Sequence, residues 1–540
     1  MGLIAAKIRN LAVGVTGGLS ALAHPRLSEI YGNAARQDSS TRNPLVVIPG
    51  IMGTRLEDPG SGLIVWGSHR KKDYPDRTNA EHMRIASHNM RSGVPLHLLT
   101  DSVEPAGAIE QFKFRLVGLP FHVQAYAAIL TTLGVGGFAM RDEGRKRKKQ
   151  RRLSLDYDAA SIATCFQFDY DWRRSIPENA GRLMRFVDKV REFAAYDSTA
   201  RGEPKNADDI RVDFVAHSMG GLLLRYFLRY GGQLLPQDGS LPKLTWSGAT
   251  RADHAVLIGT PNAGSHFALD KLIRGLPASP AMPGYGGELL GTYPTLFQLM
   301  PRDRHTPFVD RASGEPVSGL YDIETWQRMR WGLASAEADP FLEMVLPDDS
   351  PSDRRRIAID HLDKCLREAD RFHRSLDEPV DAPYDVAMHL FAGDGVLTPA
   401  CAEVEADSKH YRVIQTAHGD GTVLRTSALM DERVGQPWKP RVKTPIRWDQ
   451  VTFIPTGHMS LTRHPTFVNN VLYTLLEKPA PDCNYRHRFD GQFVAPRHGA
   501  QAAPAANTPC TDEQPAQTNG SPVVRSVGTD ARQPVGTSAP

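Results

Sequence analysis

A serine set among small residues is the feature of the sequence that most directly suggests chemistry. The apolar run Val212–Val215 leads into Ala216-His217-Ser218-Met219-Gly220-Gly221. A strand that turns sharply into a helix at a serine is the nucleophile elbow G-x-S-x-G, here with alanine at the first glycine position. Small neighbours are needed because larger side chains would clash with the backbone at so tight a turn. Ser218 is therefore the predicted nucleophile, and His217 beside it is expected to pack against the turn.

A serine hydroxyl becomes a good nucleophile only when a base accepts its proton and a third group orients that base. In chains with this elbow, the acid and then the histidine follow the serine. His458 lies in Pro455-Thr456-Gly457-His458, directly after the apolar run Val451–Ile454. A position just past a strand end suits a base, so the sequence favours His458 over three histidines that follow no strand as directly: His410, His418 and His464.

Two carboxylates compete for the role of the orienting acid. Asp394 follows the apolar run Val386–Phe391 in Gly393-Asp394-Gly395, and Asp420 lies in Gly419-Asp420-Gly421-Thr422-Val423. By position alone Asp394 is at least as good a candidate as Asp420. The residues themselves therefore leave the choice between the two open.

An oxyanion hole needs two backbone N–H groups directed at the charge that develops on the substrate. One is expected from Met219, the residue after the nucleophile. The other is expected from the glycine-containing loop Pro49–Gly53, which follows the apolar run Leu45–Ile48. Ile51 is the preferred donor in this loop, while Met52 is the reserve donor and a predicted substrate contact.

The elements that would position these residues indicate an α/β fold. Helical patterns cover Pro177–Ala195 and Gly220–Tyr230. Strands that alternate with helices indicate a mostly parallel, doubly wound sheet. Short apolar runs bounded by glycine or proline predict its buried strands: Leu45–Ile48, Thr164–Phe168, Val212–Val215, Ala255–Ile258, Val386–Phe391 and Val451–Ile454.

Two long stretches interrupt this alternation. Residues 58–111 are expected to form a lid insertion and residues 265–381 a cap domain, because neither is plausible as a bare loop. Both would lie over the carboxyl ends of the strands, where open α/β sheets bind ligands. The α/β-hydrolase domain that carries them is expected to span 39–480. The flanking parts are predicted as an N-terminal segment (1–38), a C-terminal extension (481–498) and a disordered tail without aromatic residues, Leu, Ile or Met (499–540).

Composition excludes several classes of protein. Hydrophobic residues make up 41% of the chain, which excludes a wholly disordered protein, and no apolar run is long enough to span a membrane. The net charge of +3 depends on the basic run 145–152 (RKRKKQRR), so no nucleic-acid-binding face is expected. That run is interpreted as a solvated loop, with contact to anionic lipid as the alternative.

Cysteine usage and the N-terminus bear on the compartment. The five cysteines are widely spaced without a CxxC motif, so neither a zinc site nor a disulfide framework is indicated. Sparse cysteines fit a reducing compartment, and a cytoplasmic location is favoured. The alternative is export, because Lys7 and Arg9 precede a modestly apolar stretch at Leu11–Ala23 that resembles a weak signal peptide.

The motifs together resemble the lecithin:cholesterol acyltransferase family, which includes lysosomal phospholipase A2 and phospholipid:diacylglycerol acyltransferase. They lie in the family's order over roughly residues 40 to 480. The matching segments are Pro44–Glu57, Val65-Trp66-Gly67-Ser68, Phe168-Asp169-Tyr170-Asp171-Trp172-Arg173, Ala216–Gly221, Gly259–Ser265, Gly419–Val423 and Gly457–Met459.

The resemblance implies that Asp420 is the acid, that Asp394 is structural and that Trp66 belongs to the lid and contacts substrate. It also implies a serine hydrolase or acyltransferase that acts on lipid acyl esters through an acyl-enzyme, with no metal or organic cofactor. The lid segment holds no cysteine, so it lacks the lid disulfide of secreted animal members. The alternatives are a carboxylesterase for soluble esters and a non-catalytic lipid- or partner-binding protein. Trp172 and Arg173 are expected to support the site from behind.

Overall fold

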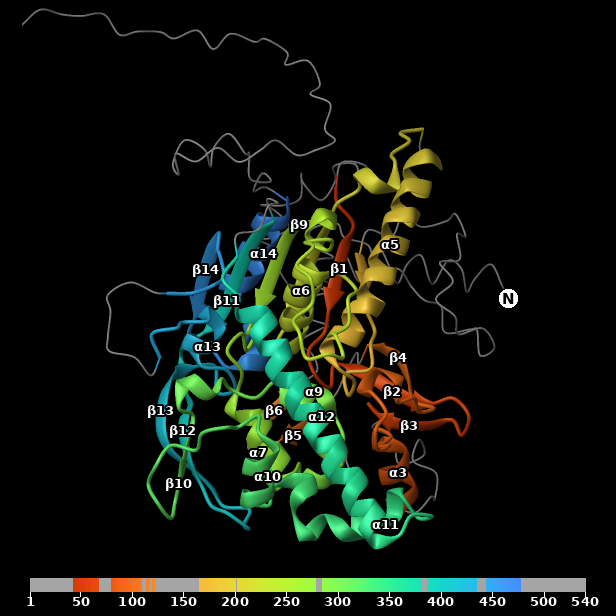
Figure 1. Ribbon diagram of the computed structural model, residues 1–540. Coiled ribbons are helices and arrows are strands. Elements are labelled where there is room, and N and C mark those ends of the chain that lie inside the picture. The colour runs from red at the N-terminus through yellow and green to blue at the C-terminus, as the bar shows by residue number, and fades with distance from the viewer. Residues whose placement is uncertain are drawn as a thin grey trace, which may run out of the picture. The chain divides into compact units, whose positions relative to one another are not determined.

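Six parallel strands form the central sheet of the computed structural model (Figure 1). The structure describes residues 42–67, 79–108, 113–116, 119–122, 165–200, 202–277, 284–380, 386–434 and 443–476. The strands lie in the order β14-β11-β9-β8-β1-β7, and each neighbouring pair is parallel. Their bounds are β1 (Leu45–Ile48), β7 (Cys165–Gln167), β8 (Val212–His217), β9 (Ala252–Ile258), β11 (Ala387–Gly393) and β14 (Gln450–Ile454).

All six strands predicted from apolar runs belong to this sheet, which confirms the expected α/β fold. Every side chain of β1 and of β8 is buried. Strands covered on both faces have no polar face, and for this reason they appear in the sequence as continuous apolar runs.

Helices cover both faces of the sheet. Phe214 of β8 contacts Phe227 of α6, while Phe391 of β11 contacts Phe467 of α14. Phe214 is aligned through β9 with Met388, three residues before Phe391. Successive strand residues point to opposite faces, so α6 and α14 pack on opposite sides of the sheet. The helices beside the sheet are α5 (Ile176–Ala200), α6 (Met219–Tyr230), α13 (Arg425–Leu429) and α14 (Pro465–Leu476).

The segment predicted as a lid contributes a small antiparallel sheet with the order β3-β2-β4. Its elements are β2 (Thr54–Asp58), β3 (Leu63–Trp66), α3 (Asn79–Ala86), the 3-10 helix η3 (Leu96–Leu98) and β4 (Glu104–Ala108). The hairpin of β5 (Lys113–Leu116) and β6 (Leu119–His122) follows. In Figure 1 the small sheet lies beyond the arrowhead of β1, at the carboxyl end of the parallel strands.

The segment predicted as a cap is mostly helical. Its strand β10 joins the hairpin β12–β13, which lies outside the predicted cap, in a second three-stranded sheet. The elements of the cap segment are α7 (His266–Arg274), α8 (Gly287–Leu290), α9 (Pro294–Gln298), β10 (Phe308–Asp310), α10 (Ile323–Met329), α11 (Asp339–Val345) and α12 (Pro351–Asp377). The hairpin outside it consists of β12 (Val396–Val404) and β13 (Tyr411–Gly419).

The long helix α12 joins the cap segment to the core around the sheet, as Figure 1 shows. Its residue Phe372 contacts the ring of Tyr226 in α6. Arg225 donates a hydrogen bond of 2.8 Å to the carbonyl of Leu376, and the Tyr230 hydroxyl donates one of 2.8 Å to Ser375. The end of α12 is thus part of the central core, and the cap segment is not a separate hydrophobic unit.

Several predicted segments lie outside the described residues. They are the N-terminal segment 1–38, the basic run 145–152, the extension 481–498 and the tail 499–540. Among the helices that the structure describes, none has the length and apolar character needed to cross a membrane.

Candidate active site

Ser218 occupies a strained turn between β8 and α6. Its backbone has φ 54° and ψ −125°, a conformation that costs a non-glycine residue free energy and is concentrated at functional sites. The turn is possible because a glycine follows two residues later. A Cβ at Gly220 would lie 2.6 Å from the carbonyl oxygens of both Ile48 and Pro49. Only glycine lets α6 begin this close to the end of β1.

Three side chains from distant parts of the chain meet in a line of hydrogen bonds. His458 begins the 3-10 helix η9 (His458–Arg463) after β14, and Asp420 directly follows β13. His458 Nδ1 lies 2.7 Å from Asp420 Oδ2, and His458 Nε2 lies 3.1 Å from Ser218 Oγ. A carboxylate only accepts, so Nδ1 carries the proton and Nε2 is free to accept from the serine hydroxyl. The structure therefore brings together Ser218, His458 and Asp420.

Backbone groups hold the Asp420 carboxylate in place. Its Oδ1 accepts hydrogen bonds from the N–H groups of Thr422 (2.9 Å) and Val423 (2.6 Å). The N–H of His458 also donates to the carbonyl of Asp420 at 2.8 Å. Asp420 is 3% exposed, so these donors replace water as the partners of a buried acid. The carboxylate is thereby fixed in the orientation that it presents to the imidazole.

The rival residues lie in other settings. Asp394 Oδ2 faces Arg425 at 3.8 Å, and its carbonyl lies 3.1 Å from His418 Nδ1. His410 pairs with Glu403 at 3.0 Å, and His464 Nδ1 accepts from the N–H of Thr466. These contacts belong to surface pairs and turns.

His217 packs against the imidazole of His458, with ring centroids 5.0 Å apart. Burial lowers the pKa of His217 to about 3, and His458 beside it adds to the effect. A histidine with so low a pKa is neutral at physiological pH. His217 therefore forms an uncharged wall beside His458 and places no second positive charge next to it.

A partly open cavity lies at Ser218 and His458. Its walls are largely apolar, with Phe267 and Leu299 supplied by the cap segment. The remaining lining residues come from the loop after β1, from the turns around Ser218 and Asp420, from the segment between β9 and α7, and from the region of His458: Gly50, Ile51, Met52, Gly53, His217, Pro261, Ser265, Thr422, Val423 and Met459.

The loop after β1 is held from behind by three aromatic side chains. Tyr170 donates to the carbonyl of Pro49 (2.6 Å), Trp66 to that of Met52 (2.9 Å) and Trp172 to that of Thr54 (3.0 Å). These bonds satisfy two carbonyl groups of the loop and that of Thr54, the first residue of β2. Ile51 and Met52 line the cavity from this loop, while Met219 follows Ser218 as the first residue of α6.

Comparison with solved structures identifies the same architecture elsewhere. A chain from "The crystal structure of Tle4-Tli4 complex" aligns with a TM-score of 0.51 and 14% sequence identity, covering 81% of this chain and 98% of that chain. No protein-family model and no curated protein matched the sequence. The fold is of the α/β-hydrolase type. At this level of identity the likeness concerns the fold alone.

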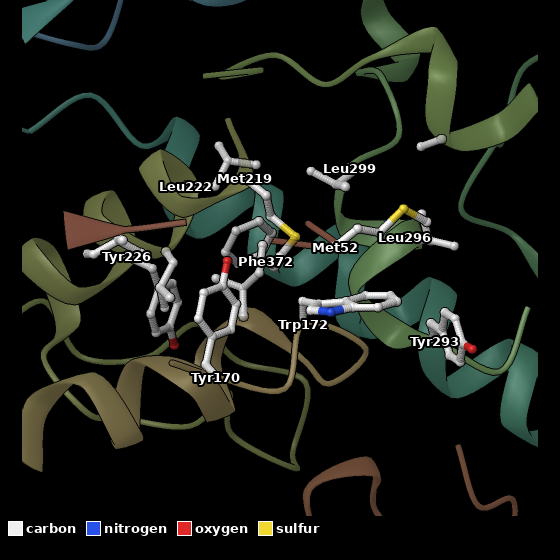
Figure 2. Packing of buried hydrophobic residues seen from close by; sticks show 14 of the residues in the cluster. Met52, Tyr170, Trp172, Met219, Leu222, Tyr226, Tyr293, Leu296, Leu299 and Phe372 are labelled. Carbon is white, nitrogen blue, oxygen red and sulfur yellow. The ribbon is translucent and has the colours of Figure 1, made fainter. Parts of the chain in front are cut away.

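Trp66 lies behind the loop rather than in the cavity wall. It is 2% exposed, and its ring makes an edge contact with Trp172 at 5.4 Å between centroids. The predicted substrate contact at Trp66 therefore corresponds to a residue that supports the loop, whereas Met52 does reach the cavity. Figure 2 shows Met52 near Trp172, which also packs against Tyr293.

Arg173 ties the predicted lid to the loop after β7. Its guanidinium is fully buried and lies 2.8 Å from Asp171 and 2.9 Å from Asp101, and it also donates to the carbonyl of Ala86. Burial alone would raise the pKa of Asp171, but Arg173 beside it offsets this effect, so the pKa lies below its usual value. Among the described residues no cluster of three or more His, Cys, Asp or Glu side chains is suited to hold a metal ion.

The cap residues Phe267 and Leu299 line the cavity but were not among the residues predicted from the sequence. Phe267 lies in the first turn of α7, and Leu299 directly follows α9. The signal available in the sequence was Ser265 before an amphipathic helix, which predicts a helix start. A predicted helix start gives the position of the helix in the sequence, but it does not predict which side chains of the helix face Ser218.

Proposed function

We propose that this protein is a serine acyl-ester hydrolase or acyltransferase that acts on lipid acyl esters. The observation that carries the proposal is the hydrogen-bonded line from Ser218 through His458 to Asp420 at the wall of an apolar cavity. A strained serine, a base within hydrogen-bond reach and a fixed acid are the groups that nucleophilic catalysis of acyl transfer requires.

In the proposed reaction, Ser218 Oγ attacks the ester carbonyl carbon while His458 Nε2 takes the hydroxyl proton. The carbonyl oxygen becomes an oxyanion held by the N–H groups of Ile51 and Met219. As the bond to the leaving alcohol breaks, His458 returns its proton to the alcohol oxygen. Water or a second alcohol then loses a proton to His458 and attacks the acyl-serine, and His458 finally reprotonates Ser218 Oγ.

The lipid character of the substrate is supported by the wall of the cavity and by the sequence motifs. Ile51, Phe267, Leu299 and Met459 offer apolar surface where an acyl chain would lie. The motifs shared with the lecithin:cholesterol acyltransferase family point the same way. The fold is compatible with this substrate class but does not select it, since one fold hosts many functions.

Labelling with a fluorophosphonate, followed by intact mass, tests the nucleophile. One adduct is expected on the wild type, and none on Ser218→Ala, because the reagent reacts with activated serines. The matched control is Ser427→Ala, which removes another buried serine hydroxyl and should leave labelling intact. An unlabelled wild type, in buffer and also with liposomes, would overturn the proposal in favour of a binding protein.

A series of esters then tests the substrate class. A lipid enzyme should hydrolyse long-chain esters in vesicles or micelles faster than the same esters as monomers. Higher kcat/KM on soluble short-chain esters, without a gain on aggregates, would instead identify a carboxylesterase.

A further inference from the structure

Ser265 connects the cap segment to the loop that carries Asp420. It lies between β9 and α7, where its N–H donates to the carbonyl of Leu299 at 2.9 Å. Its hydroxyl accepts from the N–H of Phe267 (3.2 Å) and donates to the carbonyl of Thr422 (2.6 Å). The hydroxyl thus caps α7 and at the same time reaches a residue that is 157 positions away in the sequence.

The accepting carbonyl belongs to the peptide unit that stabilises the acid. The C=O of Thr422 and the N–H of Val423 are part of one amide, and this N–H donates to Asp420 Oδ1 at 2.6 Å. An amide whose carbonyl accepts a hydrogen bond becomes a stronger donor at its N–H, because hydrogen bonds in series polarise one another. The effect is larger in a buried setting, and Val423 is 2% exposed.

The contacts form one continuous line from the first turn of α7 to the serine. The line runs from Phe267 N–H to Ser265 Oγ, through the Thr422–Val423 amide to Asp420, and from Asp420 through His458 to Ser218. We propose that Ser265 is a positioning residue for the reaction, which orders and polarises the donor to Asp420. This inference rests on the proposed function.

The line also connects the substrate cavity to the acid. Ser265, Phe267 and Thr422 all line the cavity, so a substrate that presses on α7 would act on the residue that orients Asp420. Because Ser265 at the start of α7 is hydrogen-bonded to Thr422, the orientation of the Asp420 carboxylate depends on the position of α7 against the Asp420 loop.

Substitution of Ser265, with a matched helix cap as the control, tests the inference. Ser350 caps α12 through its hydroxyl at 3.2 Å from the N–H of Asp353, at an exposed site. Ser265→Ala is expected to lower kcat and the rate of fluorophosphonate labelling about tenfold, with KM within about twofold, the size of effect of one lost hydrogen bond. Ser265→Thr, which keeps the hydroxyl, should restore both rates. Ser350→Ala should lower the unfolding temperature without changing either rate.

The outcomes separate the inference from the proposed function. Wild-type rates in Ser265→Ala would overturn the role of Ser265 and leave the proposed function intact. A raised KM at unchanged kcat would have the same meaning, because this is the result expected if Ser265 only contacts the substrate. Failure of Ser265→Thr to restore the rates would also overturn it. If Ser265→Ala does not fold, Ser265→Cys provides the test, because its thiol is a weaker donor of similar size and should give an intermediate rate. An unlabelled wild type would refute the proposed function itself.

Discussion

At the scale of single residues, the site depends on which acid orients His458. The positions of Asp394 and Asp420 in the sequence do not decide between them, since both adjoin glycines and only Asp394 follows an apolar run that predicts a strand. The geometry favours Asp420, whose carboxylate lies 2.7 Å from His458 Nδ1, whereas Asp394 faces Arg425. A sequence motif can name the acid, but only the side-chain contacts explain its selection.

Asp420→Asn should reduce kcat by about 10³- to 10⁴-fold, since an amide at this position favours the wrong imidazole tautomer. Asp394→Asn is the matched control and should stay within about twofold, because its ion pair with Arg425 is long and partly exposed. Both variants are compared with the wild type by steady-state kinetics on one ester. A large loss in Asp394→Asn alone would reverse the assignment.

At the scale of elements, the loop after β1 is shaped by residues far from it in the sequence. Tyr170 and Trp66 donate to carbonyls of this loop, and Trp172 donates to that of Thr54 at the start of β2. Met52 within it has φ 62°, a conformation that a non-glycine residue adopts only when its surroundings enforce it. The three donors are therefore expected to set the direction of the N–H groups that face the substrate.

Tyr170→Phe removes one of these donors and leaves the buried carbonyl of Pro49 without it. The unfolding free energy should fall by about 1–3 kcal/mol, and kcat should fall several-fold with little change in KM. Tyr226→Phe is the control, because Tyr226 is equally buried but donates to Gln233, outside the loop. Thermal unfolding and kinetics on both variants check the prediction, and equal kcat in the two would contradict it.

The sequence predicts the central elements far better than the peripheral ones. Buried parallel strands such as β8 are continuous apolar runs, and their neighbours in the sheet follow from the alternation with helices. β13 escapes this logic because most of its side chains are exposed, so no apolar pattern marks it. The roles of Trp66 and Ser265 also escape it, since each depends on a contact with a backbone carbonyl that only the folded chain shows.

At the scale of the whole molecule, six of the buried histidines contribute to how stability responds to acid. Burial lowers the pKa of each one, to about 4 for His82, His266 and His361, to about 3 for His217, and well below the usual value for His88 and His373. The unfolded chain takes up protons at these residues near pH 6.5, and the folded chain does so only at lower pH. The free energy of unfolding therefore falls as the pH drops from 6.5 towards 4.

Acids whose pKa is raised by burial act in the opposite direction, and Asp213 and Glu368 are the most strongly shifted. Burial raises the pKa of Asp213 and of Glu368 to about 7, so both hold a proton in the folded state below that pH. These two strongly shifted acids are fewer than the six histidines, and each group changes the unfolding free energy by up to about 1.4 kcal/mol per pH unit. Net destabilisation by acid is expected, measured as denaturant unfolding between pH 7.5 and 4.5.

His361→Gln should flatten this pH dependence by removing one such group, since glutamine can still donate to the carbonyl of Thr292. A wild-type stability that is constant over the range, or that rises with acid, would contradict the prediction.

The spacing of the site along the chain has a consequence for synthesis in the cell. Ser218 is translated well before Asp420 and His458, and β14, which delivers His458, pairs only with β11 at the end of the sheet order. A ribosome-bound chain can therefore complete the elbow while the serine still has no base. Under the proposed function, the nascent protein therefore gains its activity only after its last sheet strand is added.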